Sequence, residues 1–131
     1  MKRLDHLILT LSDLRHLGAR FAWAGPTRWR RAAPFAIALD GIGNVWVRGR
    51  DSDIDTLRRV FLHGDYEVPS APVRDRIMVR YDAIIADGKR RVIVDAGVNI
   101  GAAALWYAWL YPQAVILAIE PDPINVAMLV D

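Results

Sequence analysis

Two acidic residues and a glycine-containing loop are of the types that bind nucleotide-like ligands in other proteins. Asp95 directly precedes the loop 97–101. Gly97 and Gly101 lack a Cβ atom, so the chain can turn sharply there and a ligand can approach the backbone closely. Glu120 follows at about the offset at which an acidic side chain binds the ribose hydroxyls in nucleotide-binding βαβ units. A ligand with a ribose and a nearby cationic group would satisfy both carboxylates.

The surrounding residues predict a strand–helix–strand unit that would position these groups. Residues 92–94 form a short β-branched run, typical of a parallel strand that is covered on both faces. We expect a helix over residues 99–111, with the Asn99 side chain capping its first N–H groups, and a second strand over residues 114–119. The loop would then lie at the carboxyl ends of the strands, where open α/β sheets bind ligands.

The residues after the second strand predict a turn and a final helix. Asp122 is suited to cap that helix, with Pro123 in its first turn, and Asn125 is best explained by capping as well. Pro121 and Asp122 directly follow Glu120, so we also expect them to border the base of a bound nucleotide.

The loop sequence favours one of two cofactor classes. Dinucleotide-binding loops follow the pattern G-x-G-x-x-G, in which the second glycine makes room for a pyrophosphate. Residues 95–101 follow D-x-G-x-N-x-G, so that glycine is missing. Asp95 would repel a pyrophosphate but attract an α-amino group. These properties favour S-adenosylmethionine over NAD.

The combined pattern resembles the FkbM family of S-adenosylmethionine-dependent methyltransferases. The resemblance lies in D-A-G-V-N-I-G at 95–101, Y-P at 111–112 and E-P-D-P-x-N at 120–125, with Val98 where the family usually has alanine. A looser match around 48–53 and 65–67 extends it over about residues 45–130. It implies a Rossmann-like fold and methyl transfer to a hydroxyl of a small molecule or sugar. It also implies a set of cofactor-binding residues: Asp95, Gly97, Asn99, Gly101, Glu120, Pro121 and Asp122.

The family resemblance also sets the expected domain organisation. A complete enzyme of this kind has about twice as many residues as this chain and roughly seven strands. We therefore expect an incomplete α/β fold: an α+β extension over residues 1–88, then the start of the cofactor domain with the first βαβ unit over 89–131. A sheet that lacks its neighbouring strands would expose an apolar edge and promote self-association.

Several segments of the extension have recognisable patterns. Residues 34–48 predict a β-hairpin, since the turn at 40–44 contains Asp-Gly and Gly-Asn. Apolar residues recur at helical spacing from Leu11 to Ala22, between a start at Ser12 or Asp13 and a stop at Gly25-Pro26. A short helix begins near Ser52 or Asp53 and ends at Gly64, and residues 73–86 predict a helix, with a strand at 79–81 as the alternative.

Two groups of charged residues in the extension allow more than one interpretation. Arg48, Ser52 and Asp53 could shape the mouth of the cofactor site, but helix capping with a local ion pair explains them more simply. Trp23 and residues 28–31 form a basic and aromatic cluster, for which a solvated loop is favoured over a membrane or nucleic-acid contact. The basic run 89–91 is expected to be a solvated turn, not a phosphate site.

Composition excludes several classes of site. The chain has no cysteine, and therefore no disulfide or thiolate metal site, and its three histidines lack metal-ligand spacing. A net charge of +2 does not by itself argue for nucleic acid. The first 24 residues do not resemble a secretory signal. We therefore expect a cytoplasmic protein without stable membrane insertion, metal or nucleic-acid partner, whose acceptor is a small molecule or carbohydrate.

Overall fold

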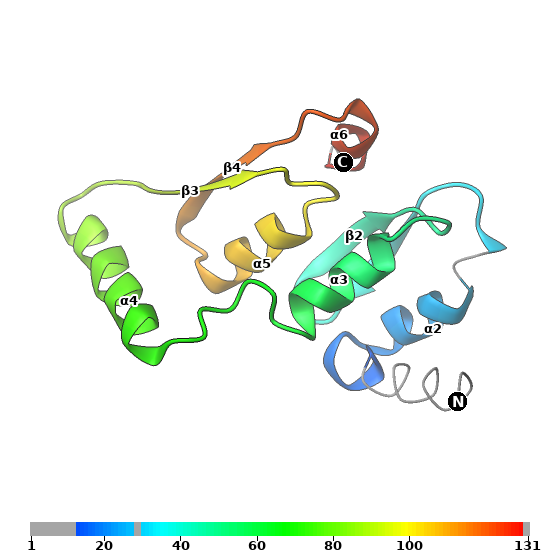
Figure 1. Ribbon diagram of the computed structural model, residues 1–131, viewed down its shortest axis with the longest axis horizontal. Coiled ribbons are helices and arrows are strands. Elements are labelled where there is room, and N and C mark those ends of the chain that lie inside the picture. The colour runs from blue at the N-terminus through cyan, green and yellow to red at the C-terminus, as the bar shows by residue number, and fades with distance from the viewer. Residues whose placement is uncertain (1–12, 28–29, 130–131) are drawn as a thin grey trace.

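The computed structural model describes residues 13–27 and 30–129, which form a mixed α/β arrangement with two small sheets (Figure 1). Leu11 and Ser12 of the first predicted helix, residues 28–29 of the basic and aromatic cluster and one of the three histidines, His6, lie outside the described ranges. The elements in chain order are α2 (Ala19–Thr27), β1 (Phe35–Leu39), β2 (Gly43–Val47), α3 (Asp53–Phe61), α4 (Ala71–Ala86), β3 (Arg91–Ala96), α5 (Ala102–Leu110), β4 (Ala114–Ile119) and α6 (Pro123–Leu129).

The predicted hairpin is confirmed. β1 and β2 pair antiparallel, with Phe35 opposite Val47 and Leu39 opposite Gly43. Gly41, in the turn, has φ = +76°, a conformation that glycine adopts without steric cost. Alternate side chains of the hairpin face the main apolar core, where they pack with residues of α2 and α3: Phe21, Phe35, Ile37, Leu39, Val45, Val47, Ile54 and Leu57.

The first predicted helix is interrupted. Residues 13–16 are helical, but Gly18 has φ = +91° and separates them from α2. A Cβ at this position would lie 2.5 Å from the carboxylate of Asp40, so the hairpin turn approaches the chain closely here. The helix was also predicted to end too early, at Gly25-Pro26, whereas α2 continues to Thr27, one residue beyond the proline.

A buried ion pair joins β2 to the start of α3. Asp53 is fully buried and accepts hydrogen bonds from the Arg48 backbone N–H at 2.7 Å and from Arg48 Nε and Nη2 at 2.9 and 2.8 Å. Ser52 occupies the N-cap position, but its side chain makes no capping hydrogen bond. The local ion pair predicted from the sequence is therefore confirmed, whereas capping by the Ser52 side chain is wrong.

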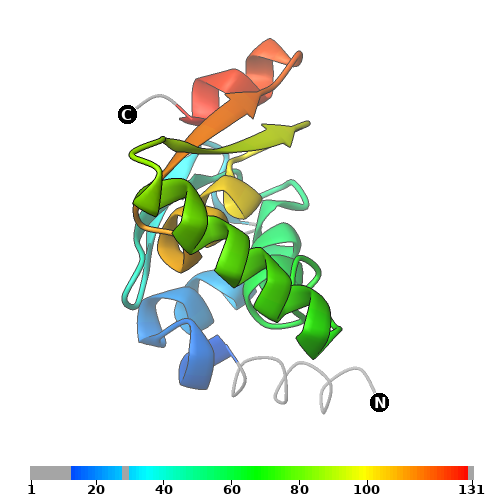
Figure 2. The same cartoon turned by 90° about the vertical axis from the view of Figure 1, so that its left-hand side faces the viewer.

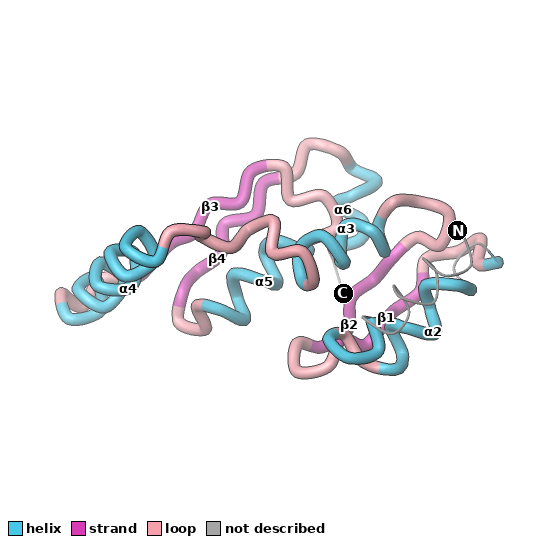
Figure 3. The backbone as a smooth tube through the Cα atoms, turned by 60° about the horizontal axis from the view of Figure 1, so that its bottom comes forward, coloured by secondary structure: helices cyan, strands magenta, loops and turns pink. Residues whose placement is uncertain are grey.

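The predicted strand–helix–strand unit is present. β3 and β4 pair in parallel, with Arg91 opposite Ala114 and Ala96 opposite Ile119. Figure 3 shows the two strands side by side. In the sequence, α5 connects the end of β3 to the start of β4. Both strands lie where the sequence predicts them. The helix is shorter than predicted, because it begins at Ala102 and not at Asn99, and it ends at Leu110.

The prediction that β3 is covered on both faces is wrong for the described chain. Val92 and Val94 are each 58% exposed, and Val115 and Leu117 on β4 are 46% and 50% exposed. α5 packs on the opposite face of this sheet, and α6 packs near β2. Among the described residues β3 and β4 pair only with each other, so the sheet has unpaired edges. Self-association through such an edge stays a prediction.

Arg91 is buried, contrary to the expectation of a solvated basic turn. Its guanidinium lies 3.6 Å from the centre of the Tyr81 ring, and Nε donates to the Tyr81 backbone oxygen at 2.9 Å. Nη1 donates to Gln113 at 3.0 Å. The side chain therefore joins α4 to the base of the β3–β4 sheet.

The helix predicted over residues 73–86 is confirmed as α4, and the alternative strand at 79–81 is wrong. The apolar side chains of α4 do not form a core, because none of its residues is buried and Ile77, Met78 and Ile85 are 38%, 40% and 42% exposed. Figure 1 shows α4 at one end of the molecule, and Figure 2 shows the molecule from that end, with α4 in front. α4 contacts β3, and Arg91 bonds to the Tyr81 backbone oxygen of this helix.

Candidate functional site

The motif segments meet at the carboxyl ends of β3 and β4. Asp95 and Ala96, the last residues of β3, lie opposite Ala118 and Ile119 on β4. The loop that follows β3 turns over this edge, and the backbone N–H groups of Gly97 and Val98 both donate to the Ile119 oxygen, at 2.8 and 3.2 Å. The structure thus brings together the two segments that the sequence predicted to share a site.

Gly97, Asn99 and Gly101, in the loop after β3, all have positive φ, but their surroundings differ. Gly97 has φ = +86°, and the position of a Cβ there is open. Gly101 has φ = +84° and is the N-cap of α5; a Cβ there would lie 2.8 Å from Leu129 Cδ2 of α6. Asn99 has φ = +54°, which an asparagine tolerates better than most residues. Asn99 is therefore a loop residue, and its predicted side-chain cap is wrong because the helix starts three residues later.

Glu120 holds the loop in place. Its Oε2 accepts the Asn99 backbone N–H at 2.6 Å, and its Oε1 accepts the Asp122 backbone N–H at 3.0 Å and Asn125 Nδ2 at 3.4 Å. The bond from Asp122, followed by that from Asn99, lowers the pKa of Glu120, so the side chain is ionised at neutral pH. A carboxylate offers about four acceptor positions, so roughly one remains for a ligand hydroxyl.

The anchoring function of Glu120 was not predicted from the sequence. The offset between Asp95 and Glu120 indicated a ribose ligand, but it gave no information about bonds to the Asn99 backbone. The signal that could have revealed it is the acid at a strand end, opposite a loop whose N–H groups need acceptors.

Asp95 has an unsatisfied carboxylate oxygen. Its Oδ2 is buried and has no hydrogen-bond partner among the described residues. Burial raises the pKa of Asp95, because no neighbouring cation or donor offsets the loss of water. A cationic or N–H-bearing group of a ligand would satisfy this oxygen. The residues present therefore fit the positively charged amino group that the sequence predicted there.

Tyr107 of α5, which the sequence did not assign to the site, is affected by the charge of Asp95. Burial is the main cause that raises the pKa of Tyr107, and the negative charge of Asp95 adds to the effect. The Tyr66 ring packs edge-on against Tyr107, with 6.0 Å between the ring centres. Helical spacing in residues 102–110 gave no indication of a partner at Tyr66, because this contact is tertiary.

Pro121 and Asp122 form the exposed rim of this edge. Asp122 Oδ1 accepts the Ile124 backbone N–H at 2.8 Å, so the predicted cap of the final helix is confirmed. The Asn125 side chain bonds to Glu120 and not to the helix terminus. Contact of Pro121 and Asp122 with a nucleotide base remains a prediction.

The N-terminal part of the chain also approaches this edge. The hydrogen bond from Asp53 raises the pKa of Arg48 most strongly, and the negative charge of Asp122 contributes more weakly. A cavity of about 380 Å³ separates the hairpin from α5 and α6, and its walls include Trp46, Val98 and Gly101. Arg48 is thus held by the buried Asp53 carboxylate, which agrees with the favoured interpretation of a local ion pair. A part for Arg48 in shaping the mouth of the site stays a prediction.

Other classes of site find little support in residues 13–27 and 30–129. There, no three His, Cys, Asp or Glu side chains are grouped as metal ligands. The helices of these ranges also lack the combination of length and apolar composition that a bilayer-crossing helix needs.

No protein-family model, curated protein or solved structure matches the chain. The resemblance to the FkbM family therefore rests on the motif residues at 95–101, 111–112 and 120–125. It stays a prediction.

Proposed function

We propose that this chain carries the cofactor-binding part of an S-adenosylmethionine-dependent methyltransferase with a Rossmann-like fold, of the FkbM type. One observation carries the proposal. The carboxylate of Asp95 keeps a buried oxygen without a hydrogen-bond partner among the described residues, at the end of a parallel strand and next to a glycine loop with open space at Gly97. A site of this kind favours a ligand with a cationic group at the strand end.

Each residue of the edge has an assigned part in binding. Asp95 receives the α-amino group, and the remaining acceptor position of Glu120 receives a ribose hydroxyl. Gly97, Asn99 and Gly101 give the loop the positive-φ conformation that brings its backbone to the ligand. The base would lie against the exposed rim formed by Pro121 and Asp122.

The same features disfavour NAD. A pyrophosphate would lie over the loop, next to the Asp95 carboxylate, and like charges in a partly buried site repel strongly. The loop also has Asn99 and not glycine at the position where the backbone would have to approach the phosphates.

S-adenosylmethionine, when bound, supplies a methyl group on a positively charged sulfur for transfer to a nucleophilic oxygen. The proposed acceptor is a hydroxyl of a small molecule or sugar, and the contribution of the chain is to hold the cofactor in a fixed orientation. The residue that takes the proton of the acceptor hydroxyl is not assigned among the residues of this edge.

Calorimetric titration of two related ligands tests the assignment of Asp95. S-adenosylmethionine carries the amino group, whereas 5′-methylthioadenosine lacks the whole amino-acid portion. We expect Asp95→Asn to weaken S-adenosylmethionine binding at least tenfold, about 1.4 kcal/mol, and to leave methylthioadenosine binding unchanged. The matched control is Asp82→Asn on the exposed surface of α4.

Three results of this experiment would count against the proposal. They are equal losses for both ligands in Asp95→Asn, an equal loss in Asp82→Asn, and tighter binding of NAD than of S-adenosylmethionine. Transfer of a radiolabelled methyl group to sugars and small hydroxyl compounds then tests the enzymatic part. Binding without transfer to any of them would favour a non-catalytic cofactor-binding module.

A further inference from the structure

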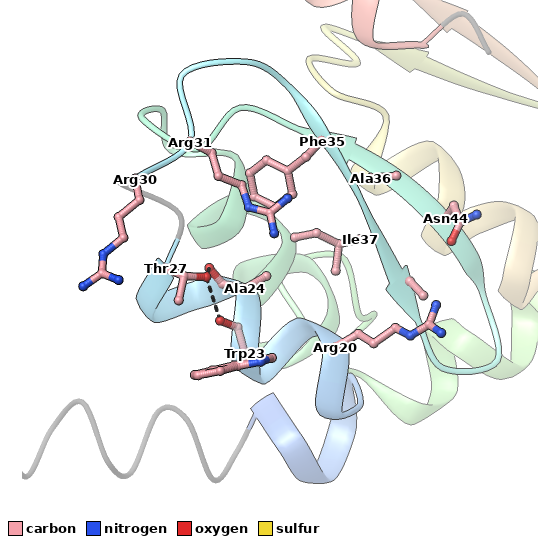
Figure 4. Close-up of a pocket in the computed structure, with 11 residues that line it drawn as sticks. Arg20, Trp23, Ala24, Thr27, Arg30, Arg31, Phe35, Ala36, Ile37 and Asn44 are labelled. Carbon is pink, nitrogen blue, oxygen red and sulfur yellow. Dashed lines mark hydrogen bonds between the residues drawn. The ribbon is translucent and has the colours of Figure 1, made fainter.

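A second, basic cavity lies between α2 and the β1–β2 hairpin, and none of the residues assigned to the cofactor lines it (Figure 4). Its volume is about 730 Å³, within the range of pockets that bind small molecules. None of the described residues that line it is acidic, and they include three arginines, two aromatic rings and two polar side chains: Arg20, Arg30, Arg31, Trp23, Phe35, Thr27 and Asn44.

The three cavity arginines differ from Arg48 and Arg58 in having no acidic partner among the described residues. Arg48 and Arg58 are each paired with a buried aspartate, Asp53 and Asp13 respectively. No ion pair or hydrogen bond joins the side chains of the three cavity arginines to another described residue. Several unpaired positive charges around one hollow attract an anion from solution.

Arg31 is the best-oriented of these groups. Its guanidinium lies 4.2 Å from the centre of the Phe35 ring, and Phe35 is only 9% exposed. Stacking on a fixed ring holds the guanidinium plane in place and leaves its N–H groups at the edge, where they match a phosphate or carboxylate. Figure 4 shows this group between Phe35 and Ile37, turned toward α2.

The α2 wall adds an aromatic surface. Trp23 is 75% exposed, a large value for a tryptophan side chain, and it lies one helical turn before Thr27. Thr27 Oγ1 donates to the Trp23 backbone oxygen at 2.9 Å, so its own lone pairs remain available as acceptors. An exposed indole next to arginines offers a stacking surface for a planar ring.

We infer that this cavity binds a small phosphate-bearing ring compound of the mononucleotide type. The phosphate pairs with Arg20 and Arg31, and the ring stacks on Trp23. The inference does not depend on the proposed methyltransferase function, because the cavity and the β3–β4 edge have no assigned residue in common.

Uridine monophosphate is a suitable probe, because its pyrimidine differs from the adenine of the proposed cofactor. We expect calorimetry on the whole chain to give a Kd that rises at least tenfold in the double variant Arg20→Gln/Arg31→Gln. Arg74→Gln, an exposed arginine of α4 outside the cavity, is the matched control and leaves the Kd unchanged. Uridine and inorganic phosphate, which each lack one half of the ligand, bind at least tenfold more weakly than the nucleotide.

A second measurement covers the case in which the double variant fails to fold. The indole N–H signal of Trp23, assigned with Trp23→Phe, shifts when the unmodified protein is titrated with the nucleotide. Glu120→Ala leaves nucleotide binding unchanged, which separates this cavity from the cofactor edge.

Four outcomes overturn the inference. They are an unshifted Trp23 signal, an equal loss of binding in Arg74→Gln, and inorganic phosphate binding as tightly as the nucleotide. The fourth is capture of the protein by phosphatidylglycerol vesicles that the nucleotide does not displace, which would show that the arginines serve an anionic lipid surface.

Discussion

The two sheets of this protein have similar sizes but different surroundings. The hairpin sheet packs with α2 and α3, and the largest fully buried side chains, Phe21, Val47, Ile54 and Leu57 among them, all lie in residues 13–61. The β3–β4 sheet is apolar as well, yet one of its faces is exposed. Most of the main apolar core therefore lies in the region up to residue 61, with Ile100 and Ala102 added from the second region. The region 71–129, which carries the candidate cofactor site, buries much less of its apolar surface.

Buried charges show the same difference. Asp13 and Asp53 are fully buried, and each is paired with an arginine. Asp95, in the second region, keeps a buried oxygen without a partner. In the first region the buried carboxylates are satisfied within the chain and contribute to structure. In the second, a carboxylate is left with an unmet hydrogen bond, as in a site that a ligand completes.

The largest effect that we predict concerns the Asp13–Arg58 pair. Arg58 Nη2 lies 2.6 Å from Asp13 Oδ2, and Nε lies 3.0 Å from Oδ1. Replacing Arg58 with methionine leaves the Asp13 carboxylate buried and unpaired, which should lower the free energy of unfolding by about 3–5 kcal/mol. Urea denaturation followed by circular dichroism measures this loss.

The exposed ion pair Arg59–Asp65 provides the control. Arg59 Nε lies 2.8 Å from Asp65 Oδ2, but the arginine side chain is 70% exposed. Arg59→Met should cost no more than about 1 kcal/mol, since exposed pairs gain little over water. Equal losses for Arg58→Met and Arg59→Met would show that the buried pair does not stabilise the first region.

The second prediction compares two leucines, one from each region. Leu57 is fully buried, whereas Leu117 on β4 is 50% exposed. Leu57→Ala creates a cavity and should cost about 2–5 kcal/mol. Leu117→Ala should cost less than about 1.5 kcal/mol, because only part of its side chain leaves water on folding. A loss for Leu117→Ala as large as that for Leu57→Ala would mean that the second sheet is covered in solution, for example by another copy of the chain.

The strands and the hairpin could be predicted because their signals are local. Residues 92–94 and 114–119 are apolar runs between turn residues, and the Asp40-Gly41 pair favours a hairpin turn. Asp122 was also predictable as a cap, because it precedes a proline at a helix start.

The remaining features depend on contacts that the sequence does not reveal. The helix is interrupted at Gly18, which has positive φ, and the Asp40 side chain lies where a Cβ of this residue would be. The start of α5 depends on the positive φ of Asn99, which Glu120 supports through a hydrogen bond from across the sheet edge. A continuous apolar strand predicts cover on both faces, but whether that cover is present depends on other segments. The proximity of Tyr66 to Tyr107 is likewise a tertiary contact.

A third, smaller effect concerns the two loop glycines. An alanine at Gly97 or Gly101 must adopt positive φ, at a cost of about 1–2 kcal/mol. At Gly101 the new Cβ also has to displace Leu129, 2.8 Å away, so Gly101→Ala should lower the thermal midpoint more than Gly97→Ala. The reverse order would show that α6 does not pack on the loop and that the second region is looser still.

The smallest effect concerns the pH dependence of the two acids at the site. Burial raises the pKa of Asp95 in the folded chain, so its contribution to stability is greatest below the unfolded pKa of about 3.9 and is lost as pH rises through the folded value. Hydrogen bonds lower the pKa of Glu120, so its contribution is present above about 4.3 and is lost as pH falls through the folded value. The two carboxylates therefore have opposite effects at neutral pH.

Isosteric amides separate these contributions. Asp95→Asn should raise the urea midpoint at pH 7, and the gain should shrink as pH falls toward 4, because the carboxylate of the unmodified chain becomes protonated. Glu120→Gln should lower the midpoint at pH 7, and the loss should shrink in acid. If Asp95→Asn also removes S-adenosylmethionine binding, the second region keeps a destabilising carboxylate because the ligand requires it. A lower midpoint for Asp95→Asn at pH 7 would instead make Asp95 a structural residue, like Asp13 and Asp53 in the first region.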